Sequence, residues 1–260
     1  MNMEINSMTK EKIEQKIYEY LEQYSDEYYP ISKINIEIVD KLDAWARFDA
    51  HTLYEGKRIL KINPDLFNQN ESFVKETLYH EFTHLQDAFN FFTYDRKSFQ
   101  RLMMIYSEVH ATEVEMDVIL STKVGNTITT FEELDLTYYM NISLHCVENQ
   151  FIYKCDKITF DTIKFSYREL YYFIGKLISL KKHNITYTYG FSDELPTVFS
   201  SLFEEIIKYF LKNKKYNYKT LLKYQCKIED SIKSYRRTYN GGSEPIENKS
   251  LFDKIFGIFK

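Results

Sequence analysis

Glycine, proline and cysteine are scarce in this chain. Its 260 residues include 7 Gly, 4 Pro and 3 Cys. So few breakers over this length favour long helices. Cys146, Cys155 and Cys226 are odd in number, and no two of them form a C-x-x-C pair. We therefore expect neither a disulfide framework nor a cysteine zinc site, and a reduced, cytoplasmic setting is the simplest prediction.

Long apolar runs and a strong excess of one charge are also lacking. No stretch reaches the ~18 apolar residues of a membrane-spanning helix, so no membrane span is expected. Residues 1–16 lack the basic-then-apolar pattern of a signal peptide. The net charge is -4 and the pI is about 5.9, so nucleic acid is not an expected partner. Aromatic residues are plentiful, with 23 Tyr and 20 Phe, and they can fill a large core.

Hydrophobic periodicity predicts a small sheet followed by a mostly helical body. Period-two alternation indicates strands at residues 34–39, 44–52 and 58–62. Helical spacing and capping residues indicate helices at residues 9–24, 70–92, 98–120, 131–153, 161–180 and 218–239, with another that begins at residue 192. We therefore expect an α+β fold, mostly α, with a small N-terminal antiparallel sheet and a helical C-terminal body.

One motif carries chemistry. Residues 80–84 read His-Glu-Phe-Thr-His, an H-E-x-x-H pattern inside a predicted helix. Residues four apart share a helix face, so His80 and His84 can bind one ion. Zinc takes neutral histidine nitrogens and keeps an open position when it is catalytic. Glu81 can reach a zinc-bound water and take its proton as the water attacks a carbonyl. The motif therefore predicts one Zn²⁺ per chain, with Glu81 as general base.

A catalytic zinc normally has three protein ligands, and the next predicted helix offers the third. Glu108 follows the motif at a distance that allows a connection and an antiparallel return of the chain. Ala111, one turn further, is small enough to let the two helices approach closely. Glu108 is the expected third ligand, and His110 is the alternative. We expect Glu115 and Asp117 to belong to a solvated acidic face.

This arrangement resembles the gluzincin group of zinc metallopeptidases, in particular its small members. Gluzincins place H-E-x-x-H on one helix and a glutamate ligand on the following one, and the resemblance covers roughly residues 30–120. It implies a zincin-like fold that hydrolyses peptide bonds of a peptide or protein substrate. His80, His84 and Glu108 would then be the ligands and Glu81 the base. Residues 59–64, Ile-Leu-Lys-Ile-Asn-Pro, resemble the edge strand with which the substrate backbone pairs in such enzymes.

The sequence departs from the gluzincin pattern after the third ligand. Larger members often carry N-E-x-x-x-D, in which the aspartate supports a ligating histidine, but Ser107 and Thr112 stand in the outer places here. Because such a partner fixes the histidine tautomer, the supporting group stays open, with Asp87 as one candidate. A donor that stabilises the developing oxyanion is also expected. The candidates for it are Tyr106, His110 and His145.

Two other functions compete with a peptidase. A di-iron helical bundle needs E-x-x-H on two helices, but Glu81-x-x-His84 is the only such pair in the chain. The second alternative is a non-catalytic metal-binding or protein-interaction protein that retains a zincin fold. The intact Glu81 argues against it, because zinc binding alone does not need this residue.

The domain organisation follows from one convincing linker, Asn-Gly-Gly-Ser at residues 240–243. Residues 1–124 form the expected zincin-like catalytic region, and residues 125–239 form a helical region packed on it. The segment 240–260 is expected to be a linker and a C-terminal amphipathic helix. The apolar residues of 251–259 share one helix face, so this segment can dock on its own domain or on a partner.

Overall fold

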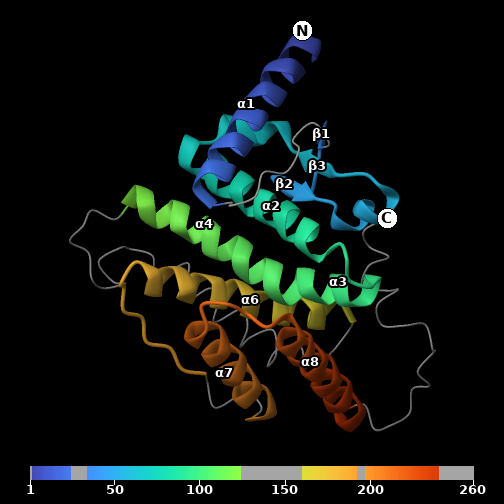
Figure 1. The fold of residues 1–260 in the computed structure, drawn as a ribbon, viewed down its shortest axis with the longest axis vertical. Helices are drawn as coiled ribbons and strands as arrows, with labels where there is room; N and C mark the ends of the chain where they lie inside the picture. Colours follow the sequence, from blue (N-terminus) through green and yellow to red (C-terminus); the bar gives the residue numbers. More distant parts are fainter. Residues whose placement is uncertain (1, 25–33, 124–159, 192–196, 240–260) are drawn as a thin grey trace.

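The computed structural model describes residues 2–24, 34–123, 160–191 and 197–239 (Figure 1). These residues form an α+β fold that is mostly helical, with one small sheet, as the sequence predicts. The elements in chain order are α1 (Asn2–Tyr24), β1 (Asn35–Ile38), β2 (Ala46–Phe48), the 3₁₀ helix η2 (Ala50–Glu55), β3 (Ile59–Ile62), the 3₁₀ helix η3 (Pro64–Asn68), α2 (Glu71–Phe91), α3 (Arg96–Leu102), the π-helix η4 (Met103–Ser107), α4 (Glu108–Lys123), α6 (Phe160–Lys182), α7 (Thr197–Lys212) and α8 (Tyr218–Tyr239).

The sheet is mixed, so the expected antiparallel arrangement is wrong for one of its strands. The strand order is β1-β3-β2, with β1 parallel and β2 antiparallel to β3. Leu60 of β3 faces Ile36 on one side and Phe48 on the other. The expected edge strand at residues 59–64 is therefore the centre of the described sheet. Its backbone is already paired on both sides, and it cannot take a substrate strand.

Helix α2, which carries the H-E-x-x-H motif, begins and packs as its sequence predicts. The side chain of Asn70 accepts a hydrogen bond from the backbone N–H of Phe73 at 2.9 Å, and this caps the helix. Leu78, Phe82 and Leu85 are fully buried and anchor α2 in the core. This burial fixes the rotation of the helix, so it also fixes the direction in which the two histidines of the motif point.

The predicted helix 98–120 is interrupted immediately before the expected third ligand. Asp95 caps α3 by accepting hydrogen bonds from the N–H groups of Lys97 and Ser98, both at 3.1 Å. A π-helix then occupies Met103–Ser107, and α4 begins at Glu108. Single π turns are rare inside helices and are frequent at functional sites.

Helices α2, α4 and α6 lie side by side, with α4 between the other two (Figure 1). Gly175 sets the distance between α4 and α6. A Cβ atom at this position would lie 2.8 Å from Cβ of Thr112 and 2.9 Å from the backbone nitrogen of Glu113, and closer still to the carbonyl oxygen of Val109. Glycine therefore lets the backbone of α6 touch α4 next to Glu108.

The remaining described helices extend this body. Helix α8 is joined to α3 by an ion pair between Arg101 and Glu229, with 3.0 Å from Nε of Arg101 to Oε1 of Glu229. None of the helices in the described ranges has the length and apolar character that crossing a bilayer requires. The helix expected at residues 131–153, Cys146, Cys155, His145, the linker at 240–243 and the segment 251–259 lie outside the described residues.

Candidate metal centre

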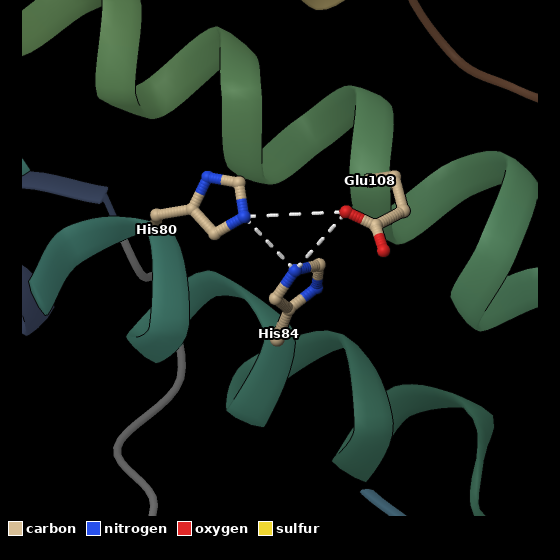
Figure 2. Close-up of side chains that lie close together, drawn as sticks. All are labelled: His80, His84 and Glu108. Carbon is tan, nitrogen blue, oxygen red and sulfur yellow. Dashed lines mark hydrogen bonds and ion pairs between the residues drawn. The ribbon is translucent and has the colours of Figure 1, made fainter. Parts of the chain in front are cut away.

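Three predicted ligands converge between α2 and α4. His80 and His84 extend from successive turns of α2, and Glu108 extends toward them from the first turn of α4 (Figure 2). The Nε2 atoms of the two histidines lie 3.1 Å apart. Oε2 of Glu108 lies 3.5 Å from Nε2 of His84 and 4.0 Å from Nε2 of His80. The structure thus brings together the three side chains that the sequence selects.

These separations are close to those that a tetrahedral zinc site requires. Zinc binds histidine nitrogen at about 2.0–2.1 Å and carboxylate oxygen at about 2.0–2.2 Å. At tetrahedral angles, neighbouring ligand atoms are then about 3.4 Å apart. The observed separations of 3.1, 3.5 and 4.0 Å lie around this value. Three protein ligands leave one coordination position for a water or a substrate.

The carboxylate of Glu108 has one oxygen that the described residues leave unsatisfied. Glu108 is only 6% exposed, and its Oε1 pairs with Nε of Arg168 at 3.0 Å. Its Oε2 is buried, and it accepts no hydrogen bond from any residue in the described ranges. A buried, unpartnered carboxylate oxygen is costly. A cation held between Oε2 and the two imidazoles would remove this cost, so the donor set fits a metal ion.

Both histidines are oriented through their Nδ1 atoms. Nδ1 of His80 lies 2.8 Å from Oε2 of Glu115, and Nδ1 of His84 lies 2.8 Å from Oγ of Ser107. An ionised carboxylate only accepts, so His80 donates its Nδ1–H to Glu115 and directs Nε2 toward the site. Ser107 holds the second histidine. The expectation that Glu115 belongs only to a solvated face is therefore wrong.

The other proposed supporting groups lie elsewhere. Asp87 is buried and pairs with His110, with 3.1 Å between Nδ1 of His110 and either carboxylate oxygen. His110, the alternative third ligand, is not part of the converging group of side chains. Thr112 contacts Gly175 across the helix interface, and its buried hydroxyl makes no hydrogen bond in the described structure. The structure thus supports neither Asp87 nor Thr112 as a partner of the ligating histidines.

The expectation for Asp117 changes once the fold is known, and the surroundings of Tyr106 can be described. Asp117 is 3% exposed and is surrounded by the hydroxyl of Ser179, by Lys182 and by Nε2 of His183. It belongs to a buried polar cluster rather than to a solvated face, because α6 covers this side of α4. Tyr106, a candidate oxyanion donor, packs against Phe91, His110, Tyr216 and Tyr218, and burial raises its pKa.

The charges around the site set the protonation of its members. Burial raises the pKa of Glu108, but the charges of Arg168 and His84 outweigh this effect and hold it well below its usual range. Burial also lowers the pKa of His80, but the hydrogen bond that His80 donates to Glu115 and the neighbouring carboxylates raise it to about 9. Glu108 is therefore an ionised ligand, and a metal ion must compete with a proton for His80.

Glu81 is fixed between α2 and the sheet. Its Oε2 accepts a hydrogen bond of 2.6 Å from the backbone N–H of Phe48 in β2. Three carboxylates, those of Glu81, Glu108 and Glu115, thus stand around the two histidines, and one guanidinium, that of Arg168, stands against them. With neutral histidines this group carries an excess of negative charge, and a divalent cation would balance it.

Arg168 and Tyr172 are site residues that the sequence does not reveal. Both belong to α6, and they lie one turn apart on the face that carries Gly175. Cζ of Arg168 lies 5.4 Å from the centre of the Tyr172 ring, which is 6.2 Å from the centre of the His80 ring. No local pattern distinguishes them from the other residues of an amphipathic helix, because their partners lie far away in the sequence.

Comparison with known proteins provides no relative. No protein-family model, no curated protein and no solved structure matches this chain. The chemistry of the site must therefore be argued from the residues of this chain alone.

Proposed function

We propose that this chain is a zinc-dependent metallopeptidase of the gluzincin type. One observation carries the proposal: His80, His84 and Glu108 converge, and the inward oxygen of Glu108 is buried without a hydrogen-bond partner among the described residues. The orientation of both histidines through Nδ1 and the position of Glu81 support it. A cytoplasmic location stays a prediction from the sequence.

Each residue of the candidate site has its own role in this proposed reaction. A zinc ion at this site supplies a Lewis acid that polarises a carbonyl and lowers the pKa of water. Glu81 accepts a proton from the attacking water while the water oxygen forms its bond to the carbonyl carbon. Glu81 then passes this proton to the amide nitrogen as the carbon–nitrogen bond breaks. His80, His84 and Glu108 hold the metal, and Glu115 and Ser107 hold the two imidazoles in place.

The hydrogen bond from Phe48 suits Glu81 to this role. It occupies Oε2 and fixes the carboxylate against β2. The other oxygen makes no hydrogen bond to any residue in the described part of the chain, and Glu81 is only half-buried, so this oxygen is the one that can accept from a water. The backbone N–H of Phe48 is neutral, so it orients the carboxylate of Glu81 without placing a positive charge beside it.

The experiment compares the unmutated protein with Glu81→Gln, both loaded with zinc and incubated with a mixed peptide digest. Mass spectrometry follows the appearance of new peptide termini. We expect cleavage by the unmutated protein, and a loss of at least about 100-fold in the variant at equal zinc content. Equal cleavage by both proteins would refute the role of Glu81. Zinc binding without any cleavage by the unmutated protein would favour the non-catalytic metal-binding alternative.

A further inference from the structure

Helix α6 presents two side chains with hydrogen-bond donors, Arg168 and Tyr172, beside the metal centre. Nε of Arg168 is buried against Glu108, yet 34% of the Arg168 side chain is exposed. Its two terminal nitrogens make no hydrogen bond to any described residue. Tyr172 is half-buried, and its hydroxyl makes no hydrogen bond to any residue within the described ranges. These three donor groups therefore have no hydrogen-bond acceptor among the described residues.

The ion pair with Glu108 orients the guanidinium. Nε of Arg168 lies 3.0 Å from Oε1 of Glu108, so this ion pair holds the guanidinium beside the proposed metal ligand. The ring of Tyr172 lies against the same guanidinium and near His80, so its position is also set by the site. The two side chains thus form a fixed donor surface next to the ligands rather than two independent surface groups.

The chemistry of this surface selects a carboxylate. The two terminal nitrogens of an arginine match both oxygens of a carboxylate, whereas a neutral carbonyl uses only one N–H and gains less from the charge. In a peptide, consecutive Cα atoms are about 3.8 Å apart. A carboxylate on the residue that follows the reacting bond therefore lies one residue spacing from the reacting carbonyl. Arg168 contacts the proposed ligand Glu108 directly, with 3.0 Å between Nε and Oε1, so its guanidinium is adjacent to the centre.

We propose that Arg168 and Tyr172 bind a substrate carboxylate, so that the substrates are peptides cut beside a C-terminal carboxylate or an acidic side chain. This inference rests on the proposed function. The charge of Arg168 is shared with Glu108 and is also influenced by Glu81. Since Glu108 would share its own charge with a bound divalent cation, we expect Arg168 to bind the carboxylate more tightly in zinc-loaded protein.

Calorimetric titration of three blocked dipeptides tests the proposal. The probes are N-acetyl-Ala-Ala with a free carboxylate, its C-terminal amide, and N-acetyl-Ala-Asp amide, whose carboxylate is on a side chain. Zinc-loaded Glu81→Gln protein keeps the probes intact during the titration. We expect the free acid to bind about tenfold more tightly than the neutral amide. The Asp probe shows whether a side-chain carboxylate is an equal source of the same chemistry.

The variants separate binding of a carboxylate from support of the fold. Arg168→Met should abolish the preference for the acid, and Arg168→Lys should keep part of it, because it retains the charge but not the planar fork. Tyr172→Phe should reduce the preference about threefold. Lys181→Met removes an exposed cation of the same helix, which bonds the carbonyl of Leu211, and should leave the preference unchanged.

Two outcomes would overturn the inference. One is equal affinity for the acid and the amide in Glu81→Gln protein that retains Arg168 and Tyr172. The other is an equal loss of affinity for the acid and for the amide in Arg168→Met, which would mean that Arg168 only supports Glu108. A protein that takes up no zinc would instead refute the proposed function. In that case the titration of metal-free protein would still test the inference, because the carboxylate binds to the terminal nitrogens of Arg168 rather than to the metal. We expect metal-free protein to prefer the acid over the amide, but less strongly than zinc-loaded protein.

Discussion

The contact of α4 with α6 depends on the absence of a side chain at Gly175. Gly175→Ala adds a Cβ atom that must lie 2.8–2.9 Å from Thr112 and Glu113 and closer to the carbonyl of Val109. Two of these three neighbours are backbone atoms, so the strain is relieved only if the helices separate. Overpacking costs about 1–3 kcal/mol, and the rigid backbone neighbours put this site in the upper part of that range, at about 2–3 kcal/mol; the better helix propensity of alanine offsets about 1 kcal/mol of it.

The expected net loss is therefore about 1–2 kcal/mol, which lowers the midpoint of thermal unfolding by about 2–8 °C in a protein of this size. Differential scanning calorimetry of metal-free protein measures it. Zinc affinity should fall as well, because α4 carries Glu108 and α6 carries Arg168. The matched control is Gly190→Ala, where an added Cβ meets nothing within 4 Å and the backbone is not left-handed. If Gly175→Ala unfolds at the same temperature as this control, the close-contact argument is wrong.

Three further predictions concern single side chains. Glu115→Gln should weaken zinc binding about 10–100-fold in a chelator competition, because it weakens the hydrogen bond that orients His80. Arg101→Met should lower the free energy of unfolding by about 3 kcal/mol, since it leaves the buried carboxylate of Glu229 unpaired. Asp95→Ala should cost about 1 kcal/mol at neutral pH, since it removes the cap of α3. Hydrogen bonds from Ser98 lower the pKa of Asp95, so this cost should vanish as the pH falls through that lowered value.

Each of these predictions has its own control. Glu113→Gln lies on the same helix as Glu115 but touches neither ligating histidine, and an equal loss of zinc affinity there would point to general charge rather than orientation. The double variant Arg101→Met, Glu229→Gln should recover part of the stability lost in the single variant, and no recovery would contradict the buried-charge explanation. For Asp95, denaturant unfolding from neutral to acid pH must show the stability difference shrinking in acid. A difference that grew in acid would have the wrong sign.

The parts of the site that lie within one helix could be predicted from the sequence. The spacing of His80 and His84 is a local property of α2, and the cap at Asn70 and the buried apolar face fix that helix. Glu108 needed only the assumption that the next helix returns alongside the first. The π turn that precedes it changes the local winding, yet it does not remove Glu108 from the site.

The parts that depend on packing between distant segments could not be predicted. Glu115 and Asp117 look alike in the sequence, but only the position of α2 brings His80 to Glu115, and only the position of α6 buries Asp117. Arg168 approaches Glu108 because Gly175 lets α6 touch α4. The expected antiparallel sheet and the expected edge position of residues 59–64 were wrong for the same reason. Period-two alternation indicates strands, but it does not say which strand lies in the centre of a sheet.

The most direct test of this account is the metal content of protein purified without added metal, with Glu108→Ala measured beside it. Elemental analysis should find about one zinc ion per chain in the unmutated protein and much less in the variant, because the variant keeps only two of the three ligands. An unmutated protein that binds no zinc, even after zinc is offered, would contradict the metal centre and the peptidase function built on it.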